Sequence, residues 1–408
     1  MTTNSFRGLL VATAAAAILS MSGAQAATAP KLSSGVAKQL QAAQKAAGTK
    51  DWATAKAAVA AAQQVSDRTD YDNYEIATFA MFIGAQTQDY PSAAVAAQAA
   101  ADSPAQPDED KSKNLRNATQ LSLMVKQYDK AAKYGKALEA TNTTDATSLE
   151  LISEAYYFNK DYTSAQAITQ KRIDATIAAH QKPERNTLEM LMNSQVNLKD
   201  EAGAEKTLEI LVATYNDPND WQQMIDVAFS TKGLRDVDAI WLGRLLFLSG
   251  ATVSSQDANM IGSTASHLTF YGDAQVAQQH GGSGFPDANA NANKDKGSIQ
   301  QQIAAGQKQN GQYNIKLAEA LYSYGMYPEA EAAARLAQTK GGATDASEVP
   351  MVLGQALAAE GKYDDAIAAF GQVTGGGPAT PRIARLWTDY ATIKKNPPSA
   401  AAPATAAK

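Results

Sequence analysis

A short frame of apolar and small residues recurs along the chain, separated by polar stretches. Residues 361–370 read GKYDDAIAAF, in which Ala366 follows Tyr363 by three positions and Phe370 follows Ala366 by four. Related frames occur in TQDYPSAAVA (87–96), NKDYTSAQAI (159–168) and GMYPEAEAAA (325–334). Residues three and four positions apart lie on one face of an α-helix. Each frame therefore predicts an amphipathic helix that begins at its aromatic residue.

Nine positions fit this frame, and we call them the anchors: Trp52, Tyr90, Tyr128, Tyr162, Glu201, Asp236, Tyr271, Tyr327 and Tyr363. Successive anchors are 38, 38, 34, 39, 35, 35, 56 and 36 residues apart. The third residue after every anchor is alanine, namely Ala55, Ala93, Ala131, Ala165, Ala204, Ala239, Ala274, Ala330 and Ala366. Two helices of three to four turns and their connections occupy about 34 residues. The spacing predicts a repeated helix–turn–helix unit in which the anchor begins the second helix and the alanine lies where the helices cross.

The residues before some anchors favour a turn. Gly325 and Gly361 precede their anchors by two positions, and Asn159 precedes Tyr162 by three. Glycine and asparagine tolerate backbone angles that other residues avoid. We therefore expect these three residues to reverse the chain between the two helices of a unit.

The last two copies resemble tetratricopeptide repeats (TPRs). The last copy carries the family's residues at Leu353, Gly354, Gly361, Tyr363, Ala366, Phe370 and Pro378. The copy at 311–337 carries them at Leu317, Ala318, Leu321, Tyr327, Ala330 and Ala337. The resemblance extends over residues 36–391 and implies an all-α fold, an α-solenoid of stacked helical hairpins that forms a superhelix. It implies about nine repeats and a C-terminal capping helix, for which Thr380–Lys394 has the apolar spacing.

Three middle copies depart from the family pattern. The copies anchored on Glu201, Asp236 and Tyr271 are degenerate, and most first helices lack the usual Leu-Gly pair. Related helical-hairpin solenoids therefore stay an alternative for the middle of the chain.

The first 26 residues have the three parts of a secretory signal peptide. Arg7 precedes an apolar run over 8–20, and the small-x-small sequence Ala24-Gln25-Ala26 follows. We predict cleavage before Ala27 and export to the periplasm, with secretion as an alternative. No second apolar run of spanning length follows, so no integral membrane segment is expected after cleavage.

Composition shifts divide the rest of the chain. Residues 27–35 are expected to form a flexible lead, and residues 392–408 a disordered tail. The sequence GGSGFPDANANANKDKG at 281–297 lacks an apolar period and predicts a loop or hinge. This loop would separate an N-terminal array at 36–280 from the C-terminal repeats and capping helix at 298–391.

The residue inventory gives little support to catalysis. The chain has no cysteine, which excludes disulfides, thiolate metal sites and a cysteine nucleophile. His180, His267 and His280 fall in different copies without metal-ligand spacing. The formal net charge is −5, and no concentrated basic run suggests nucleic acid as a partner. We predict a protein that is not an enzyme and has no cofactor or metal.

The resemblance places binding residues on the first helices, which line the inner face of such a superhelix. In the third to fifth copies these positions are Arg116, Gln120, Glu150, Glu154, Tyr157, Glu189, Asn193 and Asn197. TPR domains that clamp a terminal carboxylate need basic and asparagine residues at set positions. Leu151, Asn186 and Met190 occupy the later ones, so that clamp is not expected.

Two functions follow as hypotheses. The first is a scaffold that binds an envelope protein or peptide on the concave face. The alternative is a carrier or transporter-associated protein that holds a small ligand in the superhelix, with Met81, Phe82, Tyr157 and Phe158 as its apolar lining. Self-association along the exposed edges of the solenoid is a further expectation.

Overall fold

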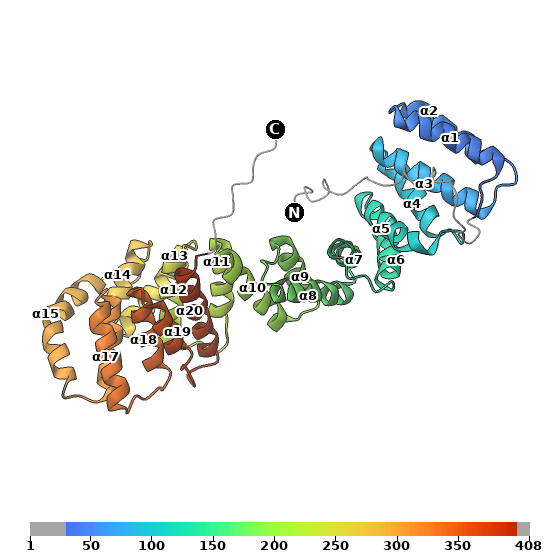
Figure 1. The fold of residues 1–408 in the computed structure, drawn as a ribbon. Helices are drawn as coiled ribbons and strands as arrows, with labels where there is room; N and C mark the ends of the chain where they lie inside the picture. The colour runs from blue at the N-terminus through green and yellow to red at the C-terminus, as the bar shows by residue number, and fades with distance from the viewer. Residues whose placement is uncertain (1–29, 398–408) are drawn as a thin grey trace. The chain divides into compact units, whose positions relative to one another are not determined.

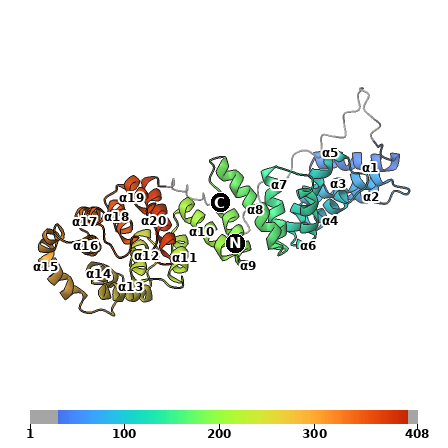
Figure 2. The same ribbon diagram turned by 90° about the horizontal axis from the view of Figure 1, so that it is seen from below.

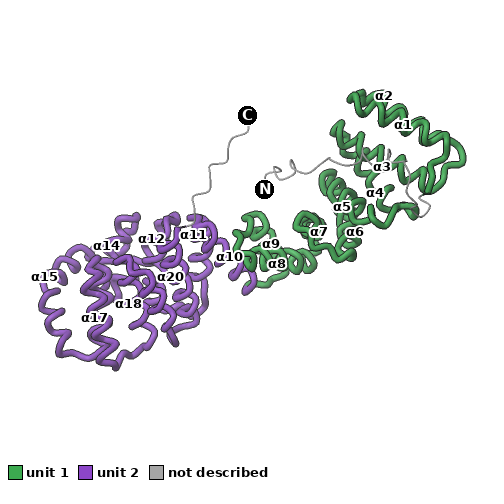
Figure 3. The backbone as a smooth tube through the Cα atoms, in the orientation of Figure 1, with its two compact units in different colours: residues 1–201 green, residues 202–408 purple. Residues whose placement is uncertain are grey.

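The computed structural model describes residues 30–397, and every regular element in that range is an α-helix (Figure 1). The all-α fold class is therefore confirmed. The chain divides into two compact units, residues 1–201 (unit 1) and residues 202–408 (unit 2) (Figure 3). The predicted signal peptide, residues 27–29 of the predicted lead and residues 398–408 of the predicted tail lie outside the described residues. Within residues 30–397, no helix combines the length and apolar character needed to cross a bilayer.

Unit 1 contains four pairs of consecutive helices and a ninth helix. The helices are α1 (Ser34–Gly48), α2 (Trp52–Gln63), α3 (Asp70–Gln86), α4 (Tyr90–Ala101), α5 (Asp108–Met124), α6 (Tyr128–Glu139), α7 (Ala146–Phe158), α8 (Tyr162–Ala178) and α9 (Arg185–Asn197). Each helix packs against the next along the chain. Buried side chains from neighbouring pairs join in continuous apolar clusters, such as the one from Met81 to Ile168.

Unit 2 begins with α10, which starts at the division between the units. Its helices are α10 (Glu201–Tyr215), α11 (Pro218–Phe229), α12 (Asp236–Ser249), α13 (Ser255–His267), α14 (Tyr271–Gln279), α15 (Ala288–Gly306), α16 (Gly311–Ser323), α17 (Tyr327–Lys340), α18 (Glu348–Ala359), α19 (Tyr363–Phe370) and α20 (Thr380–Lys395). The pairs α11–α12, α13–α14, α16–α17 and α18–α19 pack internally, and α15 stands between two pairs as a single helix.

Each of the nine anchors is the first residue of a helix, as the sequence pattern predicted. Eight of the nine alanines three positions later are buried, and Ala204 is the half-buried exception. The helices cross closely there: a Cβ added to Gly84 of α3 would lie 3.0 Å from Cβ of Ala93 on α4. A larger side chain at such a position would force the pair apart.

The turns before the anchors share one backbone conformation. The residue two positions before eight of the nine anchors has a positive φ: Lys50, Gln88, Lys126, Lys160, Lys199, Thr269, Gly325 and Gly361. The next residue donates its N–H to the carbonyl five positions earlier, as from Asp161 to Tyr156 and from Lys362 to Leu357, both at 2.9 Å. This is a Schellman turn, which satisfies the last carbonyls of the first helix.

The expectation for Asn159 was wrong. Its φ is −79° and it ends α7, whereas Lys160 has the φ of 65° that reverses the chain. Asn159 was chosen because asparagine tolerates left-handed angles. The turn instead requires a positive φ at the residue two positions before the anchor, whatever its type.

An aspartate cap then begins the second helix in three pairs of unit 1. Asp51, Asp89 and Asp161 each stand one residue before the anchor and accept a hydrogen bond from the backbone N–H three residues on. The donors are the N–H groups of Thr54, Ser92 and Ser164, at 3.1, 3.4 and 3.2 Å. The caps satisfy N–H groups that a helix start leaves unpaired.

The loop predicted over 281–297 is confined to residues 281–287, because α15 begins at Ala288. Ala288, Ala292 and Ile299 lie on one face of α15 and are buried, so small residues supply an apolar face that the pattern did not reveal. The short loop is also fixed: Phe285 is 5% exposed and packs at Gly262, where a Cβ would lie 1.9 Å from its ring. The division between the units falls at residue 201 and not at this loop.

The last helix, α20, packs against α19 and α18 and also against α12 near the start of unit 2 (Figures 1 and 2). Nε1 of Trp387 donates to the carbonyl of Trp241 at 3.1 Å, and both rings are fully buried. A helix was predicted at this place as a cap for the final pair. The structure shows that it also joins the last helices of unit 2 to the first ones.

A buried ionic cluster lies at the centre of unit 2, and we call it the Arg244 cluster. Arg244 on α12 donates to Asp273 on α14 at 2.7 Å, to Glu319 on α16 at 2.5 Å and to Gln355 on α18 at 2.8 Å. The Tyr322 ring lies 4.3 Å from the guanidinium carbon. All of these side chains are buried, so the cluster joins four helices in a medium where unpaired charge is costly.

Candidate functional site

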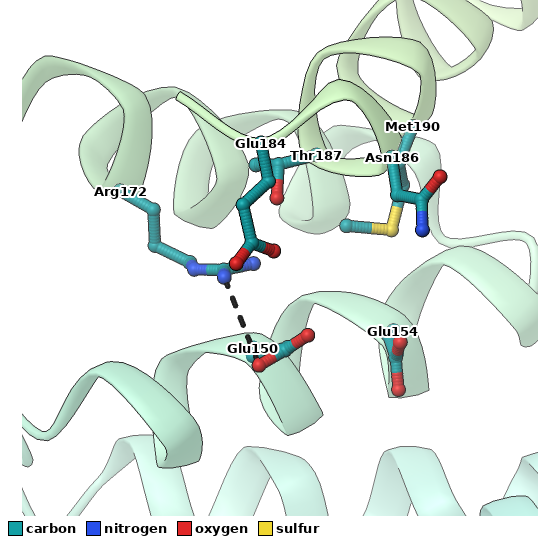
Figure 4. A pocket seen from close by; sticks show the side chains of 7 residues that line it. All are labelled: Glu150, Glu154, Arg172, Glu184, Asn186, Thr187 and Met190. Carbon is teal, nitrogen blue, oxygen red and sulfur yellow. Dashed lines mark ion pairs between the residues drawn. The ribbon is translucent and has the colours of Figure 1, made fainter. Parts of the chain in front are cut away.

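A cavity of about 280 Å³ opens among α7, α8 and the start of α9 in unit 1 (Figure 4). Glu150 and Glu154 line it from α7, and Arg172 lines it from α8. The other lining residues are Glu184, Asn186, Thr187 and Met190. Three carboxylates and one guanidinium give this lining a net negative charge.

Local structure explains how these side chains meet. Glu150 and Glu154 are four residues apart, so they lie on one face of α7. The start of α7 is fixed by Asp145, whose side chain accepts from the N–H of Ser148 at 2.9 Å. Glu184 is the residue before the first turn of α9, and Thr187 and Met190 are buried along that helix.

The Arg172 side chain lies at one end of the cavity, where it already has partners. Its guanidinium lies 3.9 Å from a Glu150 carboxylate oxygen and donates to Oγ of Ser153 at 3.4 Å. Figure 4 shows Arg172 directed to Glu150 and Glu184, whereas Glu154 lies below Asn186 and Met190. Glu154 is therefore the carboxylate with the least compensation from the cation.

The electrostatics of Glu154 follow from this placement. Burial, and then repulsion from the Glu150 carboxylate, raise the pKa of Glu154 to about 7, and Arg172 offsets only part of this. Ionised Glu154 thus destabilises the fold unless a second cation, in addition to Arg172, binds in the cavity. Such a shifted carboxyl group in a cavity is a typical property of functional sites.

The structure brings two of the eight predicted inner-face residues into this cavity, Glu150 and Glu154. Arg116 instead pairs with Asp145 at 3.5 Å, and Glu189 pairs with Arg185 at 3.7 Å. These two pairs lie outside the lining and are partly exposed.

The remaining predicted residues are spread over α5, α7 and α9. The Asn197 side chain donates to the carbonyl of Asn193 at 2.7 Å, which is a contact within one helix. The Tyr157 ring packs edge-on against Phe158 and Tyr162, and its burial raises the pKa of its hydroxyl. Gln120 is half-buried.

Sequence reasoning missed five lining residues: Arg172, Glu184, Asn186, Thr187 and Met190. Arg172 was missed because only first helices were searched, and it lies on the second helix of its pair. Asn186 and Met190 had been considered as positions where a carboxylate clamp is absent.

The residues expected to line an apolar ligand pocket pack between helices. Met81 is buried in the core of unit 1, and Phe82 meets Trp52 with ring centroids 6.3 Å apart. Phe158 stacks on Tyr128 at 5.3 Å and is 37% exposed. These contacts show that the rings of Phe82 and Phe158 pack against aromatic rings of neighbouring helices.

No group of three or more histidine and carboxylate side chains within residues 30–397 is arranged to hold a metal ion. Of the three histidines, His280 stacks on Phe247 with ring centroids 4.6 Å apart.

Comparisons with known proteins do not assign the chain to a family. No protein-family model matches the sequence, and no curated protein matches it.

Proposed function

We propose that this chain is an exported, non-enzymatic binding protein of the TPR type that recognises a protein or peptide partner in the cell envelope. Three sequence features support the proposal: the signal-peptide pattern, the nine anchors with their alanines, and the TPR resemblance of the last two copies. The positions of the anchors at helix starts are consistent with it.

The observation that carries the proposal is the acidic cavity of unit 1. Glu154 is held where its ionised form is unfavourable, and a neutral residue of the same shape would be more stable there. Features that reduce stability are expected mainly where binding requires them. The excess of carboxylates favours a basic side chain of the partner, and Met190 offers an apolar wall for the stem of a lysine or arginine.

Capture from the native envelope tests this function. The chain without residues 1–26 would be crosslinked to its own envelope fraction, affinity-purified and analysed by mass spectrometry. We expect one dominant protein partner, whose recovery falls at least tenfold in the double variant Glu150→Gln, Glu154→Gln. Glu109→Gln, an exposed carboxylate at the start of α5, is the matched control and should leave recovery unchanged.

Two results would contradict the proposal. Equal recovery from the double variant would remove the cavity as the site. A small molecule retained in native mass spectra, without any protein partner above background, would instead favour the ligand-carrier alternative.

A further inference from the structure

The acidic cavity of unit 1 has room for one long side chain. Its volume of about 280 Å³ lies just below the range of about 300–1,000 Å³ in which drug-sized ligands bind. A single side chain of a partner fits this space, whereas a folded segment does not. The free polar groups of the lining therefore decide which side chain can enter.

The cavity has one cation of its own, and that cation is already paired. The Arg172 guanidinium lies 3.9 Å from a Glu150 carboxylate oxygen and donates to Oγ of Ser153 at 3.4 Å. Figure 4 shows that it is also directed to Glu184. Glu154 lies one helical turn further along α7, and its carboxylate has no hydrogen-bond partner within residues 30–397. A negative charge at that end of the cavity is thus left without a partner.

The Thr187 hydroxyl is a second unpaired group, and it comes from a different helix. Thr187 is only 8% exposed, yet its hydroxyl has no hydrogen-bond partner in the described part of the chain. Figure 4 shows this hydroxyl directed into the cavity. Buried polar side chains are nearly always hydrogen-bonded, because an unpaired one loses its contacts with water and gains nothing in return. The Thr187 hydroxyl therefore indicates a ligand group that the chain itself does not supply.

The start of α9 does not oppose a cation in the cavity. A helix start normally attracts an anion, because its first N–H groups are unpaired. Here the N–H groups of Thr187 and Leu188 both donate to the carbonyl of Glu184, at 3.1 and 3.2 Å. The Glu184 carboxylate also stands at this helix start, where it offsets the partial positive charge. The charge that remains to be balanced is that of Glu154.

The arrangement of the free acceptors favours arginine over lysine. Glu154 lies on α7 and Thr187 on α9, so the two acceptors are on different walls of the cavity. An arginine guanidinium carries five donors in a planar fork and can reach two separate acceptors at once, whereas the three donors of lysine radiate from one atom. The buried Met190 adds an apolar wall, and a guanidinium is more weakly hydrated than an ammonium group.

We propose that the cavity binds one arginine side chain of the partner, with the Glu154 carboxylate and the Thr187 hydroxyl accepting hydrogen bonds from its guanidinium. This inference rests on the proposed function, since it names the side chain that the partner inserts. Glu154 supplies the charge that any cation needs. Thr187 supplies the second acceptor, which distinguishes a guanidinium from an ammonium group.

Methyl NMR spectroscopy of the chain used for envelope capture tests this assignment. The probes are N-acetyl-arginine amide, N-acetyl-lysine amide and N-acetyl-citrulline amide, the last of which has the shape of arginine without its charge. The readout is the ¹³C-methyl signal of Met190, which lines the cavity and is assigned with Met190→Leu. Titrations are made at pH 8, where Glu154 is ionised because its pKa is raised to about 7.

We expect the arginine probe to bind about fivefold more tightly than the lysine probe, and the citrulline probe to leave the signal unchanged. Glu154→Gln should weaken arginine binding roughly tenfold, because a hydrogen bond to a charged group is lost. Glu109→Gln, the exposed control carboxylate, should not weaken it. Thr187→Val should reduce the preference for arginine over lysine to about one, a ratio that a purely structural role of Thr187 would not change.

Several results would overturn the assignment. Equal affinities for the arginine and lysine probes, or unchanged arginine binding in Glu154→Gln, would reject it and leave the proposed function intact. The same holds if no probe shifts the Met190 signal while envelope capture still falls in the double variant Glu150→Gln, Glu154→Gln, since the partner would then enter the cavity with another group. If that variant also leaves capture unchanged, the proposed function fails together with the inference.

Discussion

Arg244→Met is the substitution for which the structure gives the largest expected effect. All five N–H groups of Arg244 donate hydrogen bonds. Nε and one terminal nitrogen donate to Asp273, and the terminal nitrogens also donate to the Glu319 carboxylate, the Glu319 carbonyl and Gln355. Methionine fills much of the volume but leaves Asp273 and Glu319 as two buried carboxylates without a cation. Breaking a buried pair in this way costs about 3–5 kcal/mol.

Urea unfolding followed by tryptophan fluorescence is the assay. Trp221, Trp241 and Trp387 are fully buried in unit 2, so their emission reports mainly on that unit. With an m-value of about 2 kcal/mol/M, the midpoint should fall by roughly 1.5–2.5 M urea.

A triple variant separates lost packing from stranded charge. Arg244→Met combined with Asp273→Asn and Glu319→Gln removes the carboxylates together with the cation, so most of the stability should return. A loss below about 1 kcal/mol in the single variant would refute the reasoning. An unrestored triple variant would show that shape and not charge is responsible.

Three further predictions concern unit 1. Lys160→Gly should stabilise the unit by about 0.5–1 kcal/mol, because Lys160 has a left-handed φ that glycine adopts without strain; thermal unfolding checks this, and a loss of stability would contradict it. Asp161→Ala should cost about 1 kcal/mol by removing the cap on Ser164, whereas Asp174→Ala on the exposed side of α8 should cost little. Glu154→Gln should be nearly neutral near pH 4 and stabilising by up to about 3 kcal/mol near pH 8, since the raised pKa of Glu154 makes its ionised form costly as the pH rises to about 7. Denaturant midpoints at the two pH values measure this difference, and a stabilisation that does not change with pH would assign the effect to packing.

The sequence alone was sufficient to place nine helix starts and eight of the nine buried alanines that follow them. The reason is local: an anchor and the alanine three residues later lie within one turn of the helix that they define. The positive φ of Lys160 was not predictable, because lysine has no preference for left-handed backbone angles. The Schellman turn imposes this φ on whichever residue stands two positions before the anchor.

Long-range features were harder to predict for a different reason. Arg382 and Glu205, or Trp387 and Trp241, are far apart in sequence, and nothing near either residue indicates its partner. The acidic cavity contains Glu150 and Glu154, which the sequence pattern had placed on one face of a first helix, but their role in binding a partner stays a prediction. Arg172 lies on α8, and its place in the cavity depends on how α8 packs against α7 and α9, which the sequence does not indicate.

The single helix α15 has a consequence for how unit 2 can change by gain or loss of repeats. Before α15, the Arg244 cluster takes Arg244 and Asp273 from the second helices of their pairs, α12 and α14; after α15, it takes Glu319 and Gln355 from the first helices, α16 and α18. The single helix α15 thus exchanges the places of first and second helices in the pairs that follow it. The four side chains meet only because of this exchange. Helical arrays usually lengthen or shorten by whole pairs. Here, an added or deleted pair between α12 and α18 would separate Arg244 from Asp273, Glu319 or Gln355 and leave buried polar groups without partners. The number of helices between α12 and α18 is therefore fixed by electrostatics.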